Sequence, residues 1–574
     1  MGIRFPARNW VRGYDREAFT ADIIAAAIVS IMLIPQSLAY ALLAGLPAEV
    51  GLYASILPLI AYALLGTSST LSVGPVAITS LLTASALAAI TEAGSTDYLA
   101  GAIMLAALSG LMLLAFGLLR LGFVANFLSH SVVSAFISAS ALIIALSQLK
   151  HLLGVDADGD NVLAMAHDLL GSLGVIHGPT LVLGALALAL LLGMRSFGAR
   201  LWEKLGLKQH SARLVNRSAP VLIVLITLGL VWALSLDAAG VAVVGTIPRG
   251  LPLPTLPSFD LELIRQLIIP ALLISIIGYV ESISVGRTLA AKRRERIDSN
   301  QELVGLGAAN LASAVSGALP VTGGFSRSVV NFDAGARTQA ASIYAALLIA
   351  LATVLLTPAL YYLPNATLAA TIIVAVLSLV DFSVFAKTLR FSRSDFSAVM
   401  LTFFMTLGFG VEVGVSAGVL VSLLLYLYRT SRPHIAEVGQ VAGTEHFRNV
   451  KRYRVILYPE ILTLRVDETL FFANANYLEE MVYDRVFQDD RIAHVILMFS
   501  AINELDFSAL EVMETLNARL FEQGILLHIS ELKGPVQDRL EAVHFLEELT
   551  GQVYLTQYQA IRDLAGRHGY EAIS

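Results

Sequence analysis

The sequence predicts a membrane protein of the all-α class with a smaller α/β domain at its C-terminal end. Three observations carry this prediction. The 574 residues are 56% hydrophobic and only 14% charged, with a mean hydropathy of +0.73, whereas soluble domains carry about 25% charged residues. Apolar stretches recur throughout the first 430 residues. The remaining 144 residues hold 35 of the 82 charged residues and a net charge of −9.

The composition also excludes several classes of function. The chain has no cysteine, which removes thiol catalysis and thiolate metal sites. Its net charge of −6 offers no basic surface for nucleic acid. No cluster of metal ligands and no activated nucleophile stand out in the sequence. The sequence therefore predicts that the protein is not an enzyme. It predicts no catalytic residues, no metal and no cofactor.

The N-terminal segment, residues 1–20, is predicted to be cytosolic. The apolar run after Asp22 is too long for a signal peptide and has no small-residue cleavage signature. About 20 apolar residues cross the hydrocarbon core, so this run is predicted to be the first span. The segment before it is basic through Arg4, Arg8, Arg12 and Arg16.

Residues 21–430 are predicted to form the transmembrane domain, which contains about fourteen apolar segments. Several of them are short or interrupted by Gly and Pro, and the tenth continues only weakly beyond 333. The segments are 23–43, 51–66, 75–91, 98–119, 123–149, 179–194, 219–236, 264–285, 303–318, 325–333, 339–362, 366–380, 397–410 and 413–428.

The charges of the loops predict the orientation of the chain, because cytoplasmic loops are enriched in Lys and Arg. Alternate loops are basic and the loops between them are acidic, so both termini are predicted to be cytoplasmic. The basic residues are Arg195, Arg200, Lys204, Lys208, Arg213 and Arg217, then Arg287, Lys292, Arg293, Arg294 and Arg296, then Lys387, Arg390 and Arg393. The acidic residues are Glu92, Asp97, Asp156, Asp158 and Asp160.

Two interrupted segments, Ser68–Ala77 and Gly317–Ser328, precede the third and tenth spans. Each segment is predicted to be a short extended stretch that contains glycine and is followed by a helix that begins within the membrane. A helix that begins in mid-membrane leaves its first N–H groups unpaired and places its positive dipole end there. Two such helices in equivalent positions of two seven-span halves indicate an anion site at the centre of an inverted repeat. A kinked ordinary helix at Gly74 and Pro75 is the alternative.

Glu281 and Arg327 are two ionisable residues within predicted spans, where a charge is expensive and suggests a function. Arg327 adds positive charge where an anion would sit. Glu281 would repel that anion when ionised and would stop repelling it when protonated, which is the logic of proton–anion coupling. The alternative is an ion pair that only holds two helices together.

Gln36 and Tyr40 lie one turn apart on the first predicted span, so they share one helix face. An amide and a phenol on one face can contact a ligand, and packing in the protein core is the alternative for Tyr40.

The segment after residue 430 alternates short strands with amphipathic helices, which predicts a small α/β domain. The expected strands are Val455–Tyr458, Ile461–Val466, His494–Phe499 and Ile525–Ser530, and the expected helices are Asn476–Phe487, Ser508–Gln523 and Val536–Leu549.

Several of these motifs resemble one known family. Ile34–Tyr40, Gly45–Pro47, Gly51–Pro58, Pro320–Asn331 and Gly335–Thr338 resemble the signatures of the SulP sulfate-permease family of anion transporters. Asn503–Glu511 and Leu532–Asp538 resemble the C-terminal STAS domain of that family. The likeness runs in order along nearly the whole chain.

The resemblance implies a fourteen-span, seven-plus-seven inverted repeat like that of the uracil permeases, followed by a cytosolic STAS domain at residues 431–574. A mobile core domain (spans 1–4 and 8–11) would carry the anion past a gate domain (spans 5–7 and 12–14), and the protein would be a homodimer. The implied anion-binding residues are Gln36, Tyr40, Val76, Ala77, Gly324, Phe325, Ser326 and Arg327, and Glu281 matches the acidic position of proton-coupled members.

Two departures from the family pattern matter. Sodium-coupled bicarbonate carriers of the family have Asp on span 8 with Thr one turn later, whereas here Glu281 is followed by Val285, which argues against sodium. In related STAS domains the phosphorylated Ser follows an Asp-Ser pair. Here Ser508 follows Asp506-Phe507, so a phosphorylation switch is not indicated.

The sequence thus predicts proton-coupled sulfate uptake by an elevator mechanism across a bacterial plasma membrane. Its partners would be the anion, H+, the lipid bilayer and a second copy of the chain, with a cytosolic partner of the STAS domain also possible. The alternatives are a bicarbonate or C4-dicarboxylate transporter or exchanger, a passive anion channel or electromotile-type protein, and a membrane sensor that binds an anion without flux.

Overall fold

The structure is a computed structural model that describes residues 5–91, 95–123, 129–157, 162–206, 208–209, 212, 216, 219–248, 250–257 and 260–570. The chain divides into two compact units, Met1–Ser422 and Leu423–Ser574. Of the charged residues named above, Arg4, Glu92, Asp158, Asp160, Arg213 and Arg217 lie outside the described residues.

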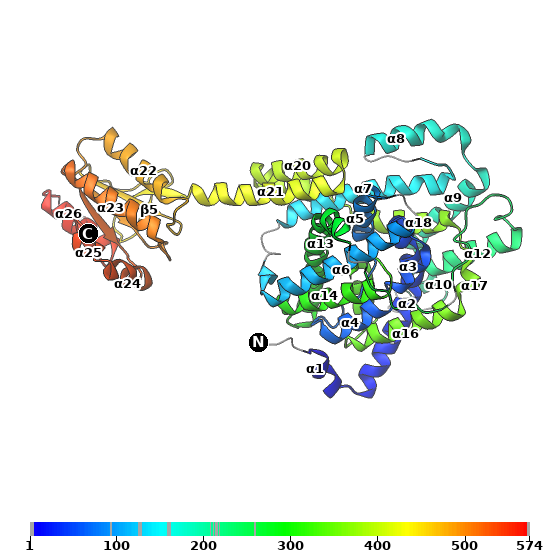
Figure 1. Cartoon of the computed structure of the whole chain (residues 1–574). Coiled ribbons are helices and arrows are strands. Elements are labelled where there is room, and N and C mark those ends of the chain that lie inside the picture. Colours follow the sequence, from blue (N-terminus) through cyan, green and yellow to red (C-terminus); the bar gives the residue numbers. More distant parts are fainter. Residues whose placement is uncertain are drawn as a thin grey trace. The chain divides into compact units, whose positions relative to one another are not determined.

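The first unit is helical (Figure 1), and in its described residues each of the fourteen predicted apolar segments overlaps one helix or a broken pair of helices. In chain order these are α2 (Arg16–Leu43), α3 (Ala48–Tyr53) with α4 (Leu57–Leu65), α5 (Ala77–Ala88), α6 (Thr96–Leu118), α7 (His130–Leu153), α9 (Gly178–Gly193), α12 (Ala219–Leu234), α13 (Leu261–Arg293), α14 (Ser299–Val315), α15 (Phe325–Asp333), α16 (Ala340–Leu355) with α17 (Thr357–Leu360), α18 (Asn365–Leu377), α20 (Arg393–Phe409) and α21 (Val411–Ser431).

Shorter helices connect these elements. By length and composition alone, the described residues contain seven helices able to cross a membrane. The helices α5 and α15 are shorter, and each follows a two-residue strand, β1 (Val73–Gly74) and β2 (Thr322–Gly323). The connecting helices are α1 (Ala7–Arg12), α8 (Val162–Gly171), η2 (Ser172–Val175), the π-helix η3 (Met194–Gly198), α10 (Ala199–Lys204) and α19 (Ser383–Phe391).

The helices of the first unit pack in two groups. In one group α14 packs against α4 and α6, α16 against α2, and α13 against α5 and α6. In the other, α18 packs against α7 and α9, α20 against α7, and α12 against α9. The helices α2 and α18 make contact between the groups. The two groups therefore meet along a boundary formed by α2 and α5 on one side and by α18, α12 and α7 on the other.

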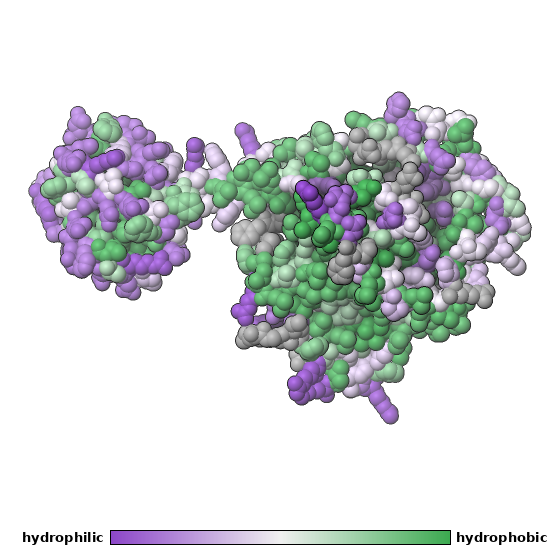
Figure 2. All heavy atoms as spheres, in the orientation of Figure 1, coloured by the Kyte–Doolittle hydropathy of each residue, from purple (hydrophilic) through white to green (hydrophobic). Residues whose placement is uncertain are grey.

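The surface of the first unit is apolar over much of the face shown in Figure 2. On the helices of this unit, large apolar side chains such as Leu111, Leu118 and Trp232 are more than half exposed. A patch of this extent on a soluble protein would be costly, and it suits contact with lipid. Hydrophilic residues dominate the visible surface of the second unit (Figure 2).

The second unit is a six-stranded sheet with helices on both faces. The strand order is β4-β3-β5-β6-β7-β8, with β5 to β8 parallel and β3 and β4 antiparallel. Alternate residues of β6 belong to two separate apolar clusters, because successive side chains point to opposite faces of a sheet. The strands are β3 (Ile435–Gln440), β4 (Phe447–Asn449), β5 (Ile461–Val466), β6 (His494–Met498), β7 (Leu526–Ser530) and β8 (Val553–Tyr554), and the helices are α22 (Ala475–Gln488), α23 (Phe507–Glu522), α24 (Gly534–Ala542), α25 (Phe545–Glu548) and α26 (Gln557–Arg567).

Three details of this unit differ from the prediction. Val455–Tyr458 forms isolated bridges rather than a strand. The helix predicted over Val536–Leu549 is two helices, because His544 between them has a left-handed φ of 60°. The strands β3, β4 and β8 and the helix α26 were not predicted. These strands lie at or near the edges of the sheet, where charged residues such as Glu437 interrupt the apolar pattern.

Candidate functional site

The two interrupted segments meet at the centre of the first unit. Strands β1 and β2 pair antiparallel, with Val73 opposite Gly323 and Gly74 opposite Thr322. Each strand leads into a short helix whose N-cap, Val76 or Gly324, has extended backbone and no capping side chain. The first N–H groups of α5 and α15 therefore have no side-chain partner, and their positive dipole ends are available to an anion. An ordinary kinked helix at Gly74 and Pro75 is excluded.

Side chains from neighbouring helices satisfy the extended backbone of β2. Asn310 of α14 accepts from the Val321 N–H at 2.9 Å and donates to the Val321 carbonyl at 2.9 Å. Ser282 of α13 accepts from the Gly323 N–H at 2.8 Å and lies 2.7 Å from the Thr322 hydroxyl. Irregular backbone at membrane depth is tolerated only where protein or water supplies such partners.

A central cavity with an empty volume of about 520 Å³ lies where the two helices begin. All eight residues predicted to bind the anion line it, and Glu281 does as well. They come from four elements: Gln36 and Tyr40 from α2; Val76 and Ala77 from the start of α5; Glu281 from α13; and Gly324, Phe325, Ser326 and Arg327 from the start of α15.

Arg327 supplies the positive charge of the central cavity. Its side chain is 2% exposed, and Nη1 donates to the Pro75 carbonyl at 2.6 Å. Nε and Nη2 are buried and have no hydrogen-bond partner. A Cβ at Gly324 would lie 2.8 Å from Nη2 and 2.9 Å from Nε, so only glycine leaves these donors room. Buried donors without partners are rare, and here they face a cavity that an anion can fill.

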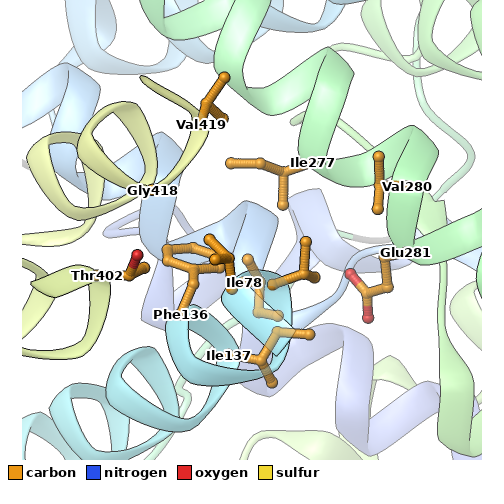
Figure 3. A pocket seen from close by; sticks show the side chains of 11 residues that line it. Ile78, Phe136, Ile137, Ile277, Val280, Glu281, Thr402, Gly418 and Val419 are labelled. Atoms are coloured by element: carbon orange, nitrogen blue, oxygen red, sulfur yellow. The ribbon is translucent and has the colours of Figure 1, made fainter. Parts of the chain in front are cut away.

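Glu281 does not form the ion pair with Arg327 that was considered as an alternative. Among the described residues no ion pair involves either side chain, and Glu281 Oε2 is buried without a hydrogen-bond partner. Its carboxylate also borders a small pocket that is otherwise lined mainly by apolar side chains, among them Ile78, Phe136 and Ile277 (Figure 3).

A second buried carboxylate provides a contrast. Glu302 of α14 is 1% exposed and accepts hydrogen bonds from the Tyr62 hydroxyl, from the Thr67 N–H and hydroxyl, and from the Ser68 N–H, at 2.6–3.2 Å. Glu302 is thus saturated and structural, whereas Glu281 has an unpartnered oxygen beside the central cavity.

Sequence reasoning missed a fifth element that lines the central cavity. Ala375, Val376, Ser378 and Leu379 lie at the end of α18, in the second packing group. No signal marked them, because the segment 366–380 reads as an ordinary apolar span. Only the position of Ser378 at the polar end of this span could have drawn attention.

In the second unit Ser508 is the second residue of α23 and is exposed. The Asp506 side chain caps this helix by accepting from the Ala509 N–H at 2.8 Å. Within the described part of the chain, no group of three or more His, Asp or Glu residues is placed to hold a metal ion.

Comparison with known proteins gives consistent matches. Residues 19–402 match the sulfate permease family, and residues 453–560 match the STAS domain. A chloroplastic sulfate transporter of Arabidopsis thaliana is 36% identical over 92% of this chain and 77% of its own length. A probable sulfate transporter of Mycobacterium tuberculosis is 34% identical over 96% of each chain.

Solved structures share the fold. The murine Solute Carrier 26 family member A9 anion transporter in the inward-facing state gives a TM-score of 0.89 at 22% identity, covering 98% of this chain and 94% of that one. The transmembrane domain of a cyanobacterium bicarbonate transporter, BicA, gives 0.59 at 21% identity, covering 72% and 98%. The predicted fold class, a helical membrane domain of this type followed by a STAS domain, is confirmed.

Proposed function

We propose that this chain takes up sulfate together with protons. The chain belongs to the sulfate permease family and is a multi-pass membrane anion transporter rather than an enzyme. The observation that carries the proposal is the central cavity. Two helix N-termini and two unpartnered N–H groups of Arg327 converge on it, which is a donor set for an anion.

The proton would be carried by Glu281. Its carboxylate lines the same cavity as Arg327, so an ionised Glu281 opposes the binding of an anion and a protonated one does not. By linkage, a bound anion favours protonation of Glu281 to the same extent. The unpartnered Oε2 and the apolar pocket beside it favour a carboxyl group that changes its protonation state rather than one fixed in an ion pair.

An elevator motion fits the way the helices pack. The anion-binding residues belong to the group that contains α2, α5, α13 and α15, and the opposing wall belongs to α18 of the other group. These groups correspond to the core and gate domains implied by the family. Movement of the first group along the second would carry the cavity from one side of the membrane to the other.

The orientation follows from the loop charges. Lys and Arg gather on η3 and α10, at the end of α13 and on α19, which favours a cytoplasmic location for these segments and for both termini. We place the protein in a bacterial inner membrane as a homodimer, in keeping with the mycobacterial relative and with the family.

Bicarbonate is the second candidate substrate, because backbone N–H groups and one arginine bind planar and tetrahedral anions alike. The deciding experiment is uptake of radiolabelled sulfate into proteoliposomes, with unlabelled sulfate, bicarbonate and a C4-dicarboxylate as competitors. Sulfate is expected to compete at the lowest concentration. Competition by bicarbonate or dicarboxylate at tenfold lower concentration than sulfate would contradict the proposal.

A further inference from the structure

Two vestibules adjoin the central cavity. We call them the arginine vestibule, marked by Arg195, and the acidic vestibule, marked by Glu281 and Asp381. Their empty volumes are about 1230 and 1510 Å³. Phe325 and Ser378 line both vestibules and the central cavity, so they stand where the three spaces meet.

The arginine vestibule opens onto two of the residues proposed to hold the anion that do not line the acidic vestibule. Gln36 and Ser326 line both this vestibule and the central cavity, whereas neither of them lines the acidic vestibule. Glu281 shows the opposite distribution, because it lines the central cavity and the acidic vestibule but not the arginine vestibule. The two functional parts of the site thus face different spaces.

The charged residues that line the two vestibules also differ. Arg195 is the single charged residue among the described residues that line the arginine vestibule. It lies in the π-helix η3, an irregularity that is frequent at functional sites, and its Nη1 donates to the Val374 carbonyl of α18 at 3.3 Å. This bond joins η3 to α18 at the wall of the vestibule, and the Arg195 residue is exposed.

The acidic vestibule carries four titratable or charged residues: His130, Glu281, Arg287 and Asp381. Arg287 is engaged with Ser299, to which its Nη2 donates at 2.7 Å. Hydrogen bonds from Ser383 lower the pKa of Asp381, which keeps that carboxylate ionised. With Glu281 ionised, the two carboxylates outnumber the single guanidinium of Arg287, which disfavours a divalent anion in this vestibule, and Glu281 offers a carboxyl group that can take up a proton.

We propose that anion and proton reach the site by separate routes: the anion passes through the arginine vestibule, guided by Arg195, and Glu281 exchanges its proton through the acidic vestibule. This inference rests on the proposed sulfate transport. It assigns to Arg195 the role of a positioning residue that raises the local concentration of the anion beside Gln36 and Ser326.

Single cysteines test the two routes, because the chain has none of its own. Thr371→Cys places a thiol in the arginine vestibule and Ser134→Cys places one in the acidic vestibule. Both are small hydroxyl residues of intermediate exposure, so the variants form a matched pair. Each would be modified with a bulky neutral maleimide and assayed for sulfate–sulfate exchange, which needs no net proton movement.

The Thr371→Cys adduct is expected to lower exchange at least tenfold, while the Ser134→Cys adduct leaves exchange within twofold of the unmodified variant. Block by the Ser134→Cys adduct, or no block by the Thr371→Cys adduct, would overturn the separate routes. Absence of sulfate exchange by the unmodified, monodisperse parent would instead refute the proposed function, and this inference with it.

Arg195 itself is tested by Arg195→Gln, with Arg195→Lys and Arg200→Gln as controls. Arg200 is exposed and lines neither vestibule. At low ionic strength Arg195→Gln is expected to raise the KM for sulfate supplied at the cytoplasmic face about tenfold, with the response to a pH gradient retained. Arg195→Lys restores most of the affinity and Arg200→Gln has no effect. An unchanged KM in Arg195→Gln, or an equal rise in Arg200→Gln, would overturn the role of Arg195.

Discussion

At the scale of single residues, two buried carboxylates show how the surroundings separate a structural acid from a functional one. Glu302 accepts four hydrogen bonds from protein donors, whereas Oε2 of Glu281 accepts none. A saturated carboxylate stabilises the fold through the hydrogen bonds that it accepts. An unpartnered buried oxygen adds no hydrogen bond to the fold and costs desolvation, and our proposal gives Glu281 a role in transport instead.

This contrast predicts that a Glu→Gln substitution lowers stability at Glu302 but not at Glu281. Glu302→Gln replaces an acceptor oxygen with an NH2 group that faces donors, and it should cost about 1–3 kcal/mol for each lost bond. Glu281→Gln removes no hydrogen bond or ion pair recorded among the described residues, so the Tm of the detergent-solubilised protein should change little. A large drop in Tm for Glu281→Gln alone would show that its carboxylate has a structural partner.

Gly324 allows a second prediction at this scale. Gly324→Ala puts a methyl group within 2.9 Å of the two unpartnered nitrogens of Arg327 and should displace the guanidinium. Loss of a charged hydrogen bond costs about 1.5–3 kcal/mol, so the affinity for sulfate should fall about 10- to 100-fold. Gly229→Ala is the control, since nothing lies within 4 Å of its added Cβ. Equal sulfate affinity in both variants would place the anion elsewhere.

At the scale of elements, the broken helices depend on side chains that their own sequence does not contain. The glycines and prolines of Ser68–Ala77 and Gly317–Ser328 indicated where the chain departs from a helix. The partners that satisfy the extended backbone, Asn310 and Ser282, lie on other spans. Sequence periodicity cannot reveal them, because a buried Asn in an apolar helix has the same pattern whether it binds its own helix or a neighbouring strand.

Asn310→Leu tests this support. The change leaves the N–H and carbonyl of Val321 without their partner, at about 1–3 kcal/mol for each group. The Tm should therefore fall by several degrees, and sulfate binding should weaken because β2 leads into α15. The control is Ser316→Ala, whose hydroxyl donates only to the Ala312 carbonyl of its own helix. Similar Tm values for the two variants would mean that the strand pair does not need Asn310.

A buried histidine in the sheet of the STAS domain predicts that the stability of this domain depends on pH. His528 of β7 is 1% exposed and accepts from the Gln552 N–H at 2.9 Å, and its other ring nitrogen lies 3.1 Å from His494. Burial, followed by the charge of His494, lowers the pKa of His528 to about 4. An unfolded histidine titrates near a pKa of about 6.5, so the unfolded state takes up the proton first as the pH falls.

Stability of this unit should therefore decline between pH about 6.5 and about 4, by up to about 3 kcal/mol for His528. Urea unfolding of the isolated C-terminal unit across this range measures the slope. His528→Gln should flatten it, whereas His446→Gln, at an exposed position, should not. An identical slope in the parent and in His528→Gln would refute the assignment.

At the scale of the whole molecule, the apolar segments located the helices of the first unit, because a membrane domain needs apolar surface along most of its helices. The residues that line the central cavity were named partly from the two interrupted segments, partly from motifs that resemble a family, and in the case of Glu281 from a charge within a predicted span. The wall formed by α18 and the vestibules was not, because residues such as Ser378 and Arg195 join the site only through the packing of distant helices.

The central claim is that one cavity couples sulfate to a proton through Glu281. The most direct test applies an inward proton gradient, with the outside more acidic, to proteoliposomes that contain either the parent protein or Glu281→Gln. Uptake of radiolabelled sulfate and the internal pH are recorded together. The parent should accumulate sulfate and acidify the lumen in a fixed ratio. Glu281→Gln should exchange sulfate for sulfate yet ignore the pH step. A folded Glu281→Gln protein that still concentrates sulfate on the pH gradient would contradict the account.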